Sequence, residues 1–142
     1  MKITTGLGAL IVSVLAIGLL SCSGEEVPPG TLFVYFPQLK TDSGEYMEAQ
    51  LLGEMVLDGY YLRIDKYLVI WRPGYSVRNN NGTIEVVDRN GEVVARVGEE
   101  IYMSGGEIKS LEFINTLIRE PLPQDCEGPF WLQGEVTRLN SE

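Results

Sequence analysis

The sequence predicts a mainly β fold: a small antiparallel barrel, OB or SH3-like or similar, with one short helix near residues 111–119. Turn signals such as Asp58-Gly59 and Asn81-Gly82 recur about every 8 to 12 residues, a spacing typical of sandwiches and small barrels. The runs between these turns are short and rich in β-branched and aromatic residues, as strands are. Helical spacing of apolar residues follows Gly106, which gives the one expected helix.

The strand expected at the centre of the domain covers residues 67–71, the most apolar run after the N-terminal leader. Consecutive apolar residues indicate a strand that is covered on both faces. This strand should end near Arg72, because Pro73 has no amide hydrogen to give to a sheet. Trp71 and Tyr75 would then flank a Pro-Gly turn.

Other strands follow from the same pattern of apolar runs between turns. Two hairpins are expected, each closed by a glycine-containing turn. The remaining strands stand singly, and a brief helix is also expected within residues 45–52. The strands are predicted at residues 31–36, 53–57 paired with 60–64, 75–78, 83–88 paired with 92–97, 101–103, and 130–137 with a glycine interruption.

The predicted helix rests on four apolar residues at spacings of three and four, which share one face: Leu111, Ile114, Leu117 and Ile118. Ser110 is the expected N-cap, since a serine hydroxyl accepts from the first free amides of a helix. A proline follows at position 121 and ends the helical pattern.

The N-terminus predicts export and a lipid anchor. Residues 1–21 read as a lipoprotein signal peptide: a cationic start, then an apolar run of about 14 residues, too short to span a membrane. The ending Leu-Leu-Ser-Cys resembles the bacterial lipobox, which implies diacylation of Cys22. Residues 22–30 would be a flexible tether, 31–138 a single β-rich domain and 139–142 a frayed tail. An uncleaved anchor helix or an ordinary signal peptide are the alternatives.

Composition excludes several functional classes. The net charge of the 142 residues is -9 and the basic residues are dispersed, which argues against binding to a phosphate backbone. There is no histidine, so Ser-His-Asp triads, Cys-His pairs and histidine metal sites are all excluded. No catalytic residue, cofactor or metal site is predicted.

Two acidic motifs are candidates for a functional site. Asp88-Arg89-Asn90-Gly91 is similar to the start of a calcium loop but is better explained as a turn. Glu99, Glu100 and Glu107 offer carboxylates for a metal or for acid-base catalysis, although such residues are usually just solvated.

Aromatic residues provide the candidate binding site. Strand alternation cannot bury both Tyr60 and Tyr61, nor readily the turn from Trp71 to Tyr75. The predicted binding residues are Trp71, Arg72, Tyr75 and Tyr60. Cys126 has no disulfide partner once Cys22 is acylated, and is expected to be a half-buried thiol beside Phe130 and Trp131.

The order of these motifs resembles small secreted or lipid-anchored bacterial domains of unassigned function. The motifs run from residues 53–57 through 68–76 and 93–98 to Gly105-Gly106-Glu107 and residues 126–131. The resemblance spans roughly residues 49–136 and implies a small closed barrel with no assigned activity. It also implies that such relatives often carry a cysteine where Tyr60 stands, able to pair with the one that matches Cys126.

The function expected from the sequence is therefore binding. We expect a lipid-anchored module on the extracytoplasmic face of a bacterial membrane, with an envelope protein or glycan as its partner and no nucleic acid. The main alternative is an envelope hydrolase that uses carboxylates or a metal, and a third is a structural accessory of a larger complex.

Overall fold

The computed structural model describes residues 33–44 and 47–139. The predicted signal peptide, Cys22, the tether and residues 140–142 of the predicted tail lie outside the described residues. Within the described part, no helix is long and apolar enough to span a membrane. The prediction of a mainly β fold with one short helix is confirmed. The elements are β1 (Ala49–Asp58), β2 (Tyr61–Ile64), β3 (Tyr67–Ile70), β4 (Ser76–Asn80), β5 (Thr83–Val87), β6 (Val93–Arg96), β7 (Glu100–Ile108), α1 (Leu111–Leu117) and β8 (Phe130–Arg138).

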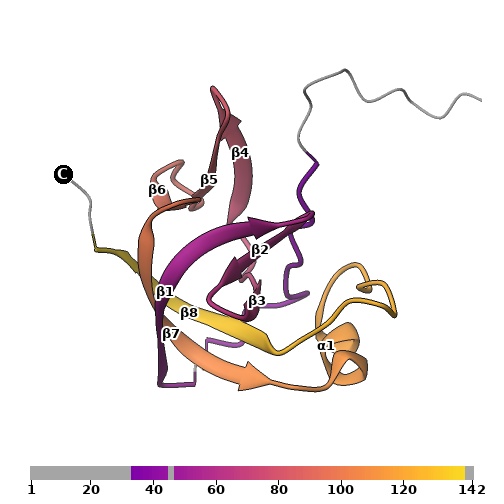
Figure 1. Ribbon diagram of the computed structural model, residues 1–142. Helices are drawn as coiled ribbons and strands as arrows, with labels where there is room; N and C mark the ends of the chain where they lie inside the picture. The colour runs from indigo at the N-terminus through magenta and orange to yellow at the C-terminus, as the bar shows by residue number, and fades with distance from the viewer. Residues whose placement is uncertain (1–32, 45–46, 140–142) are drawn as a thin grey trace, which may run out of the picture. The chain divides into compact units, whose positions relative to one another are not determined.

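The larger sheet has five strands in the order β1-β2-β3-β8-β7, and β7 pairs back onto β1, so its ladder closes on itself (Figure 1). Four of its strand pairs are antiparallel, but β3 and β8 are parallel, with Leu68 opposite Phe130. The sequence predicts an antiparallel barrel, which is wrong for this pair. The cause is the long excursion between β3 and β8, which brings the chain back in the same direction.

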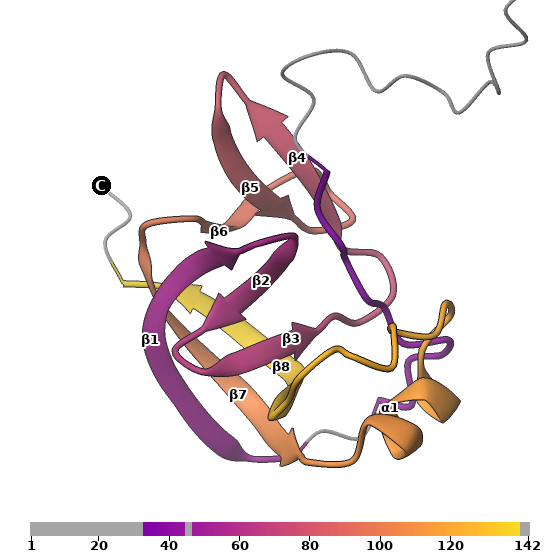
Figure 2. The same cartoon turned by 45° about the vertical axis from the view of Figure 1, so that its right-hand side comes forward.

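A second sheet, in the order β4-β5-β6, is inserted in the chain between β3 and β7 (Figure 2). Its β4-β5 turn is formed by Asn81 and Gly82, both with positive φ (51° and 92°), as the predicted Asn-Gly hairpin requires. Ile84, Val86 and Ala95 of this sheet join the same buried cluster as Met55 and Met103 of the larger one. The two sheets therefore share one core.

Strand β3 is covered on both faces, as its sequence predicts. Val69 packs in the core that the two sheets share, whereas Leu68 and Ile70 pack in a second cluster with Ile114 and Ile118 of the α1 region. Alternation sends successive side chains to opposite faces, and here each face meets an apolar layer.

Helix α1 begins after Ser110, whose hydroxyl accepts from the Phe113 amide at 3.1 Å, so the predicted N-cap is confirmed. The helix ends at Leu117, earlier than the predicted residue 119. Ile118 is already extended and forms a bridge with Leu39, which takes over the hydrogen bonding of the chain.

Several strands differ from prediction, two of them because of glycine or of tertiary contacts. Residues 33–36 form no regular strand, and Tyr35 makes only an isolated bridge with Tyr61. β7 continues through Gly105, which lies at a register shift with φ of 143°. A Cβ there would be 1.9 Å from the Leu132 carbonyl oxygen, so glycine permits the close pairing of β7 with β8. The brief helix expected in residues 45–52 is wrong from Ala49 onward, where β1 begins.

Candidate functional site

Trp71 is fully buried, so the predicted exposure of its ring is wrong, and its role in binding stays a prediction. Its ring stacks on Phe36 with centroids 5.1 Å apart and tilts against Tyr75 at 6.1 Å. Alternation along β3 explains the burial, because Trp71 continues the face of Val69 into the shared core.

Arg72 and Tyr75 are held by structural contacts. The Arg72 guanidinium pairs with Asp42 at 2.9 Å, and its backbone amide donates to Gln133 Oε1 at 2.8 Å. The Tyr75 ring is half-buried, and its carbonyl accepts a hydrogen bond from the Gln38 side chain. The turn after β3 is thus fastened to the segment around residues 38–42 and offers little open surface.

Tyr60, the fourth predicted residue, lies on an exposed aromatic surface. It is 58% exposed, beside Phe33 at 54% and Tyr35 at 37%. The Phe33 ring lies edge-on to both tyrosine rings, with its centroid 5.2 Å from that of Tyr35 and 6.1 Å from that of Tyr60. We call Phe33, Tyr35 and Tyr60 the aromatic platform. Its base is Tyr61, which stacks on Tyr35 at 5.4 Å.

The platform is attached to the sheet by a hydrogen bond from the Tyr35 amide to the Tyr60 carbonyl at 2.7 Å. Residues 33–35 therefore lie against the β1-β2 turn, where Gly59 has the positive φ of 62° that the predicted Asp-Gly turn needs. Sequence analysis missed Phe33 and Tyr35 as surface residues, because their run reads as a strand.

A shallow hollow of about 290 Å³ opens beside the platform, between the β1-β2 turn and the segment that precedes β8. Arg63 connects its two sides: the guanidinium pairs with Asp58 at 3.1 Å and donates to the Glu127 carbonyl at 3.0 Å. Asp125 and Glu127 are exposed on the far side. The hollow thus has an aromatic wall and an acidic rim.

Cys126 lines this hollow together with Tyr60, but the thiol is buried and interacts with Tyr61. Burial, with the Cys126 contact next in size, raises the pKa of Tyr61 to about 12. Burial also raises the pKa of the Cys126 thiol, which opposes thiolate formation. Phe130 shares its cluster, as predicted, whereas Trp131 belongs to the other one.

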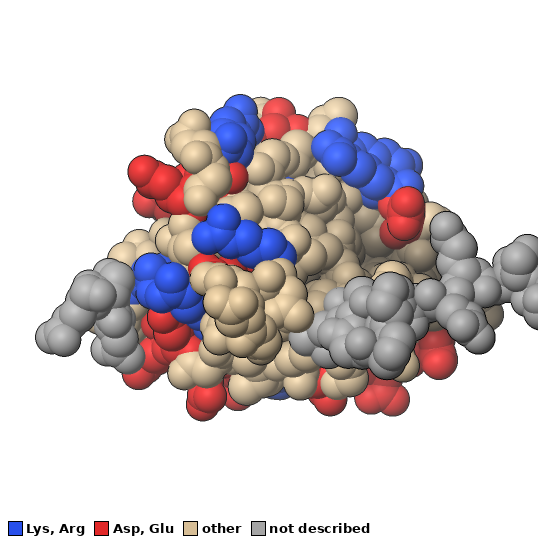
Figure 3. Space-filling model, turned by 90° about the horizontal axis from the view of Figure 1, so that it is seen from above, with Lys and Arg blue, Asp and Glu red and all other residues tan. Residues whose placement is uncertain are grey.

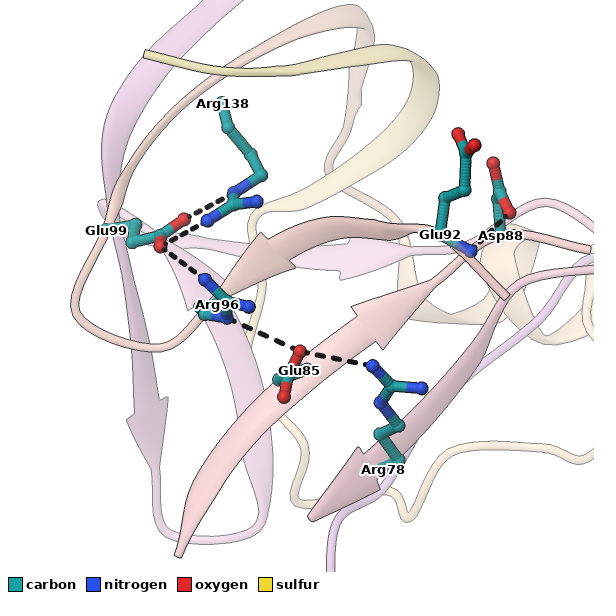
Figure 4. A network of polar contacts seen from close by, with 7 residues as sticks. All are labelled: Arg78, Glu85, Asp88, Glu92, Arg96, Glu99 and Arg138. Carbon is teal, nitrogen blue, oxygen red and sulfur yellow. Dashed lines mark hydrogen bonds and ion pairs between the residues drawn. The ribbon is translucent and has the colours of Figure 1, made fainter. Parts of the chain in front are cut away.

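The glutamates weighed as a catalytic or metal site do not converge. Glu99 is held by Arg138 through contacts of 2.7 and 2.8 Å (Figure 4), and this hydrogen bonding, with the nearby charges, lowers its pKa. Glu107, near the other end of β7, accepts from the Tyr67 hydroxyl at 3.2 Å. Eight residue steps along a strand separate them by roughly 25 Å of chain. Among the described residues, no three acidic or thiol groups gather to hold a metal.

An ion-pair network around the buried Glu85, missed by sequence reasoning, joins the small sheet to the larger one (Figure 4). Glu85 on β5 is fully buried between Arg96 at 3.3 Å and Arg78 at 3.5 Å, and Arg96 also contacts Glu99 at 3.6 Å. A hydrogen bond from Asn80 lowers the pKa of Glu85, and the two arginines add to that effect.

Two further features concern charged residues: the surface seen from above and the turn at Asp88. The view from above shows Lys and Arg side chains interspersed with Asp and Glu (Figure 3). The Asp88 carboxylate accepts from the amides of Asn90 and Glu92 at 2.8 and 3.0 Å, which confirms a turn at the motif that is similar to a calcium loop.

No family model matches the chain, and neither the curated proteins nor the solved structures gave a match. The resemblance to small lipid-anchored bacterial domains, including a cysteine at the position of Tyr60, therefore stays a prediction.

Proposed function

We propose that the protein is a lipid-anchored extracytoplasmic binding module of the bacterial envelope, and that its aromatic platform binds the sugar rings of an envelope polymer. The observation that carries this proposal is the exposure of Phe33 and Tyr60 side by side. Aromatic rings on a surface bind apolar sugar faces or partner side chains, and solvent exposure of such rings side by side is otherwise unfavourable.

The arrangement of the strands supports a binding site at the aromatic platform. The closed five-stranded sheet is proposed to be a small barrel of the OB type, with β1, β2, β3, β7 and β8 as its strands and the small sheet as an insertion. OB barrels bind oligonucleotides and oligosaccharides at the loop between their first two strands and the loop before their last strand. Tyr60 lies in the first of these loops, and Asp125 and Glu127 in the second, on opposite sides of the hollow. The likeness of this chain to OB barrels is one of strand arrangement alone.

The charge around the hollow favours oligosaccharides over oligonucleotides as the bound polymer. Asp58 on the β1-β2 side and Asp125 and Glu127 on the other form the acidic rim. These carboxylates would repel phosphates, but they are good acceptors for sugar hydroxyls. A neutral or cationic glycan fits this surface better than nucleic acid or teichoic-type anionic polymers.

The test is co-sedimentation of the purified domain with insoluble envelope polysaccharide. Tyr60→Ala and Phe33→Ala should each weaken binding about tenfold, the loss of one stacking contact of roughly 1.4 kcal/mol. Phe113→Ala is the matched control, because Phe113 is 50% exposed on α1 and outside the platform. Equal binding by wild type and both platform variants would contradict the proposal, and selective capture of an envelope protein instead would make the partner a protein.

The lipid anchor is tested separately. Radiolabelled palmitate should enter the wild-type chain, and Cys22→Ala should abolish labelling and release the protein from membranes, since two acyl chains hold a protein at a bilayer durably. An unlabelled wild-type chain would contradict the anchor. The carboxylate-dependent hydrolase has no geometric support among the described residues, where Glu99 and Glu107 lie apart and Glu99 is held ionised.

A further inference from the structure

A second hollow, away from the platform, lies where the end of α1, the segment before β1 and strand β8 meet. Its volume is about 190 Å³, and its walls are largely aliphatic. The aliphatic side chains are Leu39, Met47, Leu117 and Leu132. None of these belongs to the aromatic platform, so the two sites are independent.

One polar side chain of this hollow has an unmet hydrogen-bonding need. Gln133 lines the hollow and is 2% exposed. Its Oε1 accepts from the Arg72 backbone amide at 2.8 Å, which fixes the amide orientation, because only the oxygen can accept from an N–H. Its Nε2 is buried and has no hydrogen-bond partner among the described residues.

An unsatisfied buried donor of this kind is costly, and native proteins normally supply it with a partner. The Gln133 oxygen serves the Arg72 amide, whereas the donor half of the same side chain is left over at a position where alternation on β8 would favour an apolar residue. The unmet donor therefore marks a place for an acceptor that enters the hollow from outside.

The charge of the wall indicates which acceptor fits. Arg72 and Asp42 form an ion pair of 2.9 Å at the edge of the hollow, so the arginine charge is already balanced. A carboxylate ligand would lose hydration without gaining a net opposite charge from this neutral pair, and an ammonium ligand cannot accept from Gln133. A neutral carbonyl oxygen meets both conditions.

We propose that this hollow binds a short aliphatic acyl group with a neutral carbonyl, as in an amide or ester, whose oxygen accepts from Gln133 Nε2 while its chain packs on Leu39, Leu117 and Leu132. The volume is below the several hundred Å³ of ordinary ligand pockets, so the hollow takes one short chain and not a large molecule. Gln133 sets the specificity for the carbonyl, and the leucines contribute the apolar contact.

The test is a titration of the ¹⁵N-labelled domain with hexanamide, hexanoate and hexylamine, followed by NMR. Hexanamide should shift the Gln133 side-chain NH₂ signals at millimolar concentration and bind at least tenfold more tightly than hexanoate, with no comparable shift from hexylamine. Gln133→Glu keeps an acceptor for the Arg72 amide but removes the donor, and should weaken hexanamide binding at least tenfold.

Two controls make the result decisive. Leu117→Trp should fill the hollow and abolish the shift without touching Gln133, whereas Tyr60→Ala should leave hexanamide binding unchanged. Well-dispersed amide spectra establish that each variant is folded. The proposal is overturned if hexanamide leaves the Gln133 signals unmoved, since an internal water then satisfies Nε2, or if it binds Gln133→Glu and wild type equally.

Discussion

Aromatic residues flank two turns of this molecule, and they differ in burial. After β3, Trp71 is fully buried; between β1 and β2, Tyr60 is 58% exposed. β3 has apolar layers on both faces, and residues 36–39 are hydrogen-bonded across its end, where Trp71 donates to the Pro37 carbonyl at 2.9 Å. The β1-β2 turn is flanked by Phe33 and Tyr35, which leave Tyr60 open. The covering segment, more than the turn itself, decides between core and binding surface.

The largest effect should follow from removal of the buried ring. Trp71→Ala deletes contacts with Phe36 and Tyr75 and leaves a large cavity, which should lower the free energy of unfolding by about 3–5 kcal/mol. Equilibrium denaturation in urea measures this change. A loss below about 1 kcal/mol would mean that Trp71 is not in the core and that the two turns do not differ in burial as described.

An intermediate effect should appear at alkaline pH, at the base of the platform. Tyr61 has a folded-state pKa of about 12, against an ordinary value of 10.0. Between these values the unfolded chain loses the phenol proton while the folded one keeps it, so stability is fully present below pH 10 and falls as pH rises towards 12.

Ultraviolet titration of tyrosinate, with stability measured in parallel, checks this expectation. Tyr61→Phe is the control, because it lacks the ionisable hydroxyl and should lose less stability across the same pH range. Equal alkaline slopes in the two proteins would show that Tyr61 is as accessible to solvent as an unfolded tyrosine.

The smallest effect on stability should come from the exposed ring. Tyr60→Ala removes a side chain that contacts Phe33 edge-on, and should change the free energy of unfolding by no more than about 0.5 kcal/mol. Urea denaturation of Tyr60→Ala beside Trp71→Ala gives the contrast in one experiment. A loss as large as that of Trp71→Ala would make Tyr60 a packing residue and remove the basis of the platform.

The strand pattern and the helix N-cap were predictable because they depend on neighbouring residues: alternation, Asp-Gly and Asn-Gly turns, and Ser110 ahead of an apolar face. Properties that depend on distant segments were not. Trp71 is buried by residues 36–39, and the parallel pairing of β3 with β8 joins parts of the chain that local pattern cannot relate. Phe33 and Tyr35 lie on the surface because an irregular segment bridges to Tyr61, a contact without any local signal.

The candidate functional groups also divide into those with a local signal in the sequence and those that depend on distant segments. The absence of histidine excluded whole mechanisms from composition alone. The ion pairs that hold Glu85 and Glu99 required coordinates, since Arg138 lies far from Glu99 in the chain. Gln133 has only a weak signal in the sequence: it is a polar residue between the apolar pair Trp131-Leu132 and Gly134.

The parallel pairing of Leu68 with Phe130 has a consequence for synthesis. Until β8 has been made, β3 and β7 each expose an unpaired edge, and such edges recruit other chains into aggregates. The native contacts are of high contact order, so folding should be slow and should finish only when the last strand arrives. A chain truncated before residue 130 would therefore lack two strand pairings at once, and would be a target for proteolysis.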